Sequence, residues 1–153
     1  FVRLNEIDGD VWTVPAENMK ARLGAAQNFR VPLSAEALAV IEQARPFERN
    51  GFLFPSLRKG VISDATMARL MERRGMEARP HGFRSSLRTW LAETTDAPHE
   101  VAEAMLAHMT DNKVVRTYRQ TDYLDRRRIL LERWSDYVTG GPVNVLKFTG
   151  RMP

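Results

Sequence analysis

The chain has 153 residues, of which 43% are hydrophobic and 27% charged, and this composition favours one folded domain over a disordered chain. It has no cysteine, which excludes disulfide frameworks and zinc sites built on thiolates, and no apolar run approaches the roughly 20 residues that span a bilayer. We read no signal peptide and expect a cytoplasmic location. The sequence starts at Phe1 within what reads as a structured segment, so we expect a piece of a larger protein.

The net charge of +4 is unevenly distributed along the chain. Residues 65–90 hold six Arg against two Glu, and residues 113–133 hold seven basic side chains against three acidic ones. The segment between these blocks is acidic. Solvated helix faces would explain any one block. Two basic blocks together favour a surface that faces a polyanion.

The first third of the chain predicts a β-hairpin followed by a helix. Asp10–Ala16 and Asn28–Ser34 are short runs with alternating apolar residues, and the polar stretch between them predicts a long connecting loop. Ser34 is a good N-cap for a helix over about residues 35–45, with Ile41 on its inner face.

The rest of the chain predicts mainly helices. Ser63 is expected to cap a second helix that Gly75 ends, and a third is expected over Gly82–Thr94. Asp96 is expected to cap a fourth helix, with Pro98 in its first turn. A short helix over about residues 112–119 and a longer one that ends before the glycines at 140–141 complete the prediction. The longer helix is expected to carry one stripe of mainly apolar side chains: Tyr123, Arg127, Leu130, Leu131, Trp134, Tyr137 and Val138. The fold class is therefore mainly α with a small antiparallel sheet at the amino-terminal end, an α+β fold.

Five side chains are candidates for chemistry. Lys20 lies in the hairpin loop, His81 and Arg84 open a helix, His108 ends another, and Tyr118 follows ten positions later. Each has an ordinary structural explanation when taken alone: a solvent-exposed lysine, a capping histidine, an arginine paired with a surface acid, a half-buried histidine and a core tyrosine.

Taken together, the order Lys, His-x-x-Arg, His, Tyr resembles the active site of the tyrosine recombinases, and most closely that of prophage and genomic-island integrases. The segments DVWTVPAENMKAR, HGFRSSLRTWLAE and VAEAMLAHMTDNKVVRTYRQTDYLDRRR all resemble that family. The resemblance extends to about Val138. Its most specific part is the block from His108 to Tyr118 with the DYLDRRR that follows.

The resemblance implies a role for each candidate. Tyr118 is the nucleophile that becomes a 3′-phosphotyrosine, Arg84 is the second catalytic arginine, His81 and His108 are the activating histidines, and Lys20 is the hairpin lysine. These residue types suit phosphoryl transfer without a metal or other cofactor, since a tyrosine hydroxyl can form a covalent intermediate. A planar arginine can hold two phosphate oxygens, and imidazole titrates near neutrality.

The resemblance also implies an incomplete catalytic domain over residues 1–138 and a tail over 139–153. The family's first catalytic arginine would lie a few residues before Phe1, and Arg3 stands in the wrong local context to replace it. The implied partners are double-stranded DNA at attachment sites, three further copies in a homotetramer on DNA, and accessory DNA-bending proteins. No membrane is implied, and the expected place is the bacterial cytoplasm, in association with the nucleoid.

Three other readings remain open from the residues. A type IB topoisomerase uses the same catalytic groups and would relax DNA without strand exchange. A non-catalytic DNA-binding module would grip phosphates through its arginines but form no adduct at Tyr118. A helical interaction domain would show no salt-sensitive DNA binding.

Overall fold

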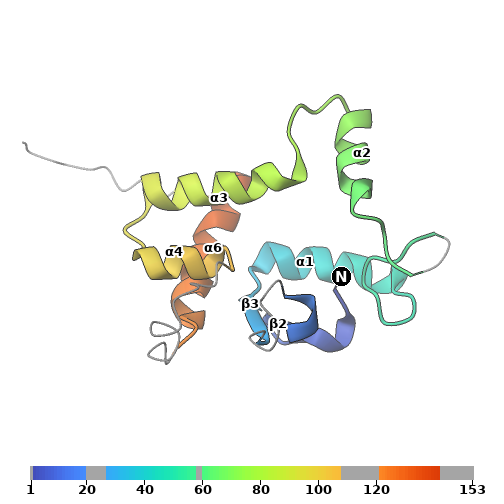
Figure 1. Ribbon diagram of the computed structural model, residues 1–153, viewed down its shortest axis with the longest axis horizontal. Coiled ribbons are helices and arrows are strands. Elements are labelled where there is room, and N and C mark those ends of the chain that lie inside the picture. Colours follow the sequence, from blue (N-terminus) through green and yellow to red (C-terminus); the bar gives the residue numbers. More distant parts are fainter. Residues whose placement is uncertain (1, 20–26, 58–59, 108–120, 142–153) are drawn as a thin grey trace, which may run out of the picture.

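A computed structural model describes residues 2–19, 27–57, 60–107 and 121–141 (Figure 1). Three of the candidate residues, Lys20, His108 and Tyr118, lie outside the described residues. So do the helix predicted over residues 112–119 and the tail beyond Gly141.

The predicted hairpin is confirmed. Strands β2 (Val11–Val14) and β3 (Phe29–Pro32) pair antiparallel, with Trp12 opposite Val31. A short strand β1 (Ile7–Asp8), which the sequence analysis did not predict, adds to β2 through a tight turn and gives the order β1-β2-β3. Two residues are too few for an alternating pattern to reveal. Short 3-10 turns, η1 (Leu4–Glu6) and η2 (Ala16–Asn18), flank the first two strands.

The first predicted helix is also confirmed. Helix α1 (Ala35–Ala44) starts after Ser34, whose hydroxyl accepts a hydrogen bond of 3.2 Å from the backbone N–H of Ala37. This bond satisfies one of the helix's unpaired amino-terminal donors. Ile41 is buried as predicted, and a 3-10 turn, η3 (Arg45–Phe47), follows.

The four remaining described helices are α2 (Ala65–Arg73), α3 (Pro80–Thr94), α4 (His99–Met105) and α6 (Leu124–Thr139). Two glycines, Gly75 and Gly140, follow helices with positive φ of 68° and 73°, the left-handed conformation that glycine adopts without strain. The predicted stops are therefore confirmed.

Two predicted caps are wrong. The hydroxyl of Ser63 lies 3.0 Å from that of Thr66 rather than on a backbone N–H, and Asp64 occupies the N-cap position of α2. Asp96 stands too early, because Pro98 is still extended (φ −55°, ψ 144°) and α4 begins only after it.

The core lies where three helices meet. Trp90 and Leu91 of α3, Val101 and Ala102 of α4, and Leu130 of α6 are buried together. The ring of Trp90 lies 5.3 Å from that of Trp134 of α6. Figure 1 shows α3 above α4, the upper end of α6 behind α3, and α2 standing apart beyond the amino-terminal end of α3.

These elements confirm a mainly helical fold with a small three-stranded antiparallel sheet. Within the described ranges, no helix is both long and apolar enough to cross a membrane.

Candidate active site

His81 and Arg84 lie at the start of α3. Arg79 is extended and precedes the helix, and Pro80 occupies the first helical position, where its missing N–H costs no hydrogen bond. His81 and Arg84 are three residues apart, so they share one face of the first turns. Both side chains are exposed. The prediction that His81 and Arg84 lie together at the start of one helix is thereby confirmed, while their catalytic roles stay a prediction.

The surroundings of Arg84 differ from those of the next arginine on the same helix. Arg88 is ion-paired, with its Nε 3.3 Å from Oε1 of Glu103 on α4. Neither the side chain of Arg84 nor that of His81 makes a hydrogen bond or ion pair with another described residue. Arg84 is therefore available for a ligand, whereas Arg88 joins two helices.

The backbone adds to this positive end. The first turn of α3 contains no acidic residue, and no side chain caps its N–H groups. Pro80 has no N–H and the N–H of Gly82 donates to the carbonyl of Arg79 at 2.9 Å, so the helix dipole is the main backbone contribution that favours an anion at this end. The amino-terminal half of α3 also extends away from α4 and α6 (Figure 1), and Phe83 on it is 53% exposed. The start of α3 can thus receive a phosphate group from outside the core.

The predicted convergence of all five candidates remains a prediction, because only His81 and Arg84 are described. The guanidinium carbon of Arg3 lies 4.0 Å from the ring centroid of Phe52. No three His, Asp or Glu side chains gather into a metal site among residues that the structure describes.

A polar cluster between α6 and the sheet was not predicted from the sequence. Asp122 accepts two hydrogen bonds from the guanidinium of Arg30 on β3, at 2.8 and 2.9 Å. Arg127 of α6 is buried, and it donates to the backbone oxygens of Asp122 (2.9 Å) and Arg30 (2.8 Å). A charged residue on the apolar stripe of the last predicted helix was the only signal for this cluster in the sequence.

The pKa of Asp122 reflects this cluster. Partial burial raises it, but the hydrogen bonds from Arg30 and the positive charges of Arg30 and Arg127 outweigh burial and hold the pKa below 3.8. The carboxylate is therefore ionised at neutral pH. Arg127 and Arg128, which belong to the basic block over residues 113–133, both make contacts within the fold. Arg128 pairs with Asp10 (2.7 Å) and Asp125 (2.8 Å).

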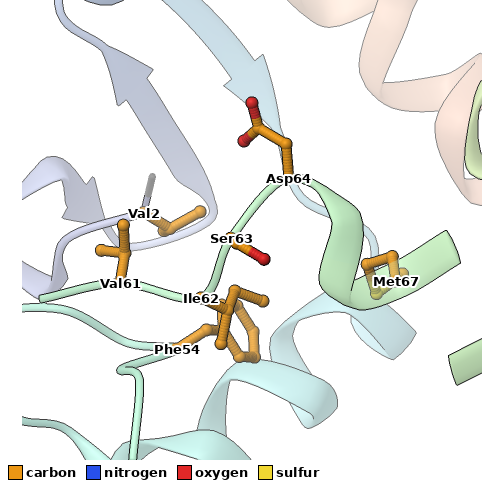
Figure 2. Close-up of a pocket in the computed structure, with 7 residues that line it drawn as sticks. All are labelled: Val2, Phe54, Val61, Ile62, Ser63, Asp64 and Met67. Carbon is orange, nitrogen blue, oxygen red and sulfur yellow. The ribbon is translucent and has the colours of Figure 1, made fainter. Parts of the chain in front are cut away.

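A separate cavity of about 270 Å³ lies between the amino-terminal segment and the start of α2 (Figure 2). Its lining is mainly apolar and consists of Val2, Phe54, Val61, Ile62, Ser63, Asp64 and Met67. Neither His81 nor Arg84 contributes to it, so this cavity is distinct from the candidate site.

Comparison with known proteins defines the class to which this mainly helical fold belongs. Residues 3–124 match the phage integrase family. The chain belongs to that family, and the resemblance seen in the sequence is confirmed.

Individual relatives agree with this assignment. The chain is 36% identical over 143 residues to prophage integrase IntA of Escherichia coli K12, covering 89% of this chain and 33% of the relative. It is 28% identical over 157 residues to the integrase of Enterobacteria phage P4, covering 90% of this chain and 36% of that relative. The chain thus spans about a third of the length of these curated relatives. No solved structure matches it.

Proposed function

We propose that this chain is the catalytic part of a site-specific recombinase that integrates or excises a mobile element by cleaving and rejoining DNA. The observation that carries the proposal is the family match over residues 3–124, a range that contains all five candidate residues. The open, positively charged start of α3 supports it, because Arg84 is available there for a phosphate.

In the proposed reaction the hydroxyl oxygen of Tyr118 attacks the scissile phosphorus and the bond to the 5′-oxygen breaks. One of the two histidines accepts the tyrosine proton, and Lys20 donates a proton to the leaving 5′-oxygen. Arg84 holds the non-bridging oxygens, where charge develops. Rejoining is the reverse, with a 5′-hydroxyl attacking the phosphotyrosine. The reaction needs no metal or cofactor.

The proposal extends to the boundaries of the catalytic part. We assign residues 1–138 to the catalytic domain and residues 139–153 to a tail, a division that the end of α6 at Thr139 supports. The first catalytic arginine is proposed to lie upstream of Phe1, in a full-length protein that also carries a DNA-clamping domain. The 153-residue chain alone should then be nearly inactive, because one preorganised donor is worth about 10²–10³ in rate.

The proposed partners follow from the same chemistry. The substrate is double-stranded DNA at attachment sites, bound by a homotetramer of the full-length protein together with accessory DNA-bending proteins. A bacterial cytoplasmic, nucleoid-associated location would bring the protein to this substrate.

The test is covalent capture on nicked suicide DNA with the full-length protein. Tyr118→Phe should abolish the covalent adduct and leave DNA binding nearly unchanged, since arginines and lysines supply the phosphate contacts. Tyr137→Phe is the matched control, because Tyr137 is a half-exposed tyrosine on α6 that stacks on Trp134. An adduct that persists in Tyr118→Phe, or that maps to Tyr137, would refute the assignment. Relaxation without strand exchange would instead indicate a type IB topoisomerase.

A further inference from the structure

We propose that Asp122 is a positioning residue, which fixes the point where the segment bearing Tyr118 joins the fold. It acts through Arg30 and Arg127 and does not touch DNA. This inference rests on the proposed function, in which Tyr118 is the nucleophile.

The first link joins two side chains that are 92 positions apart in the chain. Both carboxylate oxygens of Asp122 accept hydrogen bonds from one guanidinium, with Arg30 Nε at 2.8 Å and Nη2 at 2.9 Å. A bidentate pair of this kind fixes orientation as well as distance. Because Arg30 lies on β3, Asp122 is tied to the sheet.

The second link joins the backbones of the same two residues. The buried guanidinium of Arg127 donates through Nε to the carbonyl of Asp122 and through Nη1 to the carbonyl of Arg30. Its Nη2 lies 3.5 Å from Oδ2 of Asp122, and its carbon lies 4.9 Å from the ring centroid of Phe29. Asp122 is thus held to β3 through both its side chain and its main chain.

The local turn continues this fixation into α6. The N–H of Tyr123 donates to Oγ1 of Thr121, and that of Leu124 donates to Oδ1 of Asp122. Tyr123 itself adopts the left-handed conformation (φ 56°), which reverses the chain just before the helix. The chain direction at Asp122 is therefore set by several bonds.

Tyr118 precedes Asp122 by four residues, and four residues span at most about 14 Å. The anchor at Asp122 therefore limits the region that the nucleophile can reach. Attack on phosphorus requires tight placement, and a misplacement of about 1 Å can cost on the order of 100-fold in rate. The side chains of Arg30 and Asp122 are 51% and 33% exposed, so their pair adds little to global stability. Loss of the pair should consequently affect the reaction more than the fold.

A second ion pair between α6 and the sheet region provides a matched control. Arg128 binds Asp10 through two bonds, at 2.7 and 3.2 Å, with side chains 32% and 47% exposed. This pair resembles the Arg30–Asp122 pair in geometry and exposure. It makes no contact with residues 121 and 122 in the described structure.

The experiment measures the single-turnover rate of adduct formation by the full-length protein on nicked suicide DNA. Asp122→Asn and Arg30→Gln should each slow the adduct by on the order of 10- to 100-fold, with DNA affinity unchanged. The double variant should be no slower than the slower single, because both changes break one interaction. Asp10→Asn should react at nearly the wild-type rate. Arg30 is half exposed, so Arg30→Gln should keep the fold, and thermal unfolding checks this.

Arg30 and Lys20 belong to the same hairpin, so a defect at Arg30 could act through the general acid instead of the nucleophile. A modified substrate distinguishes these two causes. Sulfur in place of the bridging 5′-oxygen gives a leaving group that needs no proton, because a thiol pKa is only about 8.5. The defects of Asp122→Asn and Arg30→Gln should persist on this DNA. Restoration to the wild-type rate would mean that the cluster serves the lysine, and the inference would be wrong.

The remaining outcomes are distinct. An Asp122→Asn protein that reacts like wild type, or that loses DNA binding and adduct together, overturns the positioning role while leaving Tyr118 as the nucleophile. A wild-type protein that forms no adduct at Tyr118 overturns the proposed function, and this inference with it.

Discussion

Replacing Arg127 by Met tests whether the buried guanidinium holds α6 to the sheet. The side chain is only 1% exposed and donates to two backbone carbonyls, those of Asp122 and Arg30. Methionine keeps much of the aliphatic volume and adapts to irregular space. The change therefore removes the two hydrogen bonds while leaving most of the packing in place.

The expected loss follows from these contacts. A hydrogen bond to a charged group contributes about 1.5–3 kcal/mol, so two contribute about 3–6 kcal/mol. Removing a buried charge recovers part of its desolvation cost. We expect Arg127→Met to lower the free energy of unfolding by about 2–4 kcal/mol. At about 2–4 °C per kcal/mol for a domain of this size, the melting temperature should fall by about 4–16 °C.

Urea and thermal unfolding of the 153-residue chain measure this loss, with Arg128→Met as the control. Arg128 is an arginine on the same helix, and it pairs with Asp10 and Asp125 at the surface. Exposed pairs contribute about 0.2–1 kcal/mol, so the control should lose far less stability. Equal losses in the two variants, or a loss below about 1 kcal/mol for Arg127→Met, would refute the reasoning.

Three further predictions concern charge. In the full-length protein Arg84→Ala should slow adduct formation by at least about 10²–10³, whereas Arg88→Ala, which breaks only the pair with Glu103, should have little effect on the adduct rate. The pKa of Asp122 is depressed below 3.8, so its carboxylate stabilises the folded state above that pH. The difference in the free energy of unfolding between wild type and Asp122→Asn should therefore be largest at neutral pH and shrink as pH falls below 3.8. Urea unfolding of both proteins across this pH range measures it. The affinity of the 153-residue chain for DNA should fall steeply as the salt concentration rises in a titration. An affinity that does not depend on salt would exclude binding of DNA phosphates by the arginine-rich segments.

Features that depend on neighbouring residues could be predicted from the sequence. The hairpin follows from alternation, the cap at Ser34 from its side-chain chemistry, and the stop at Gly140 from its freedom to take positive φ. The cap at Ser63 was wrong because its hydroxyl lies 3.0 Å from that of Thr66 instead of on a backbone N–H. The cap at Asp96 was wrong because Asp96 lies in a turn before α4, in which the N–H of Ala97 donates to Oγ1 of Thr95. Such competition between nearby hydrogen bonds cannot be ranked from residue type alone.

Features that depend on distant residues could not be predicted. The periodicity placed Arg127 on the buried stripe of the last helix, but its partners Asp122 and Arg30 come from the preceding turn and from a strand 97 positions away. Similarly, His81 and Arg84 were predicted to share a helix start. The reason that Arg88 is paired and Arg84 is not lies in Glu103 of the next helix, which the local pattern does not reveal.

One half of helix α3 is packed in the core and the other half is exposed to solvent, and this arrangement bears on the proposed chemistry. Its carboxyl-terminal half is fixed by Trp90 and Leu91 in the core, while its amino-terminal half carries His81 and Arg84 into solvent. A helix held at one end keeps the other end in a defined place, so His81 and Arg84 need no core of their own. Helix α6 packs on the same core through Leu130 and leads back through Asp122 toward Tyr118. The start of α3 and the turn at Asp122 are thus attached to one small core, which makes their relative placement a property of the fold.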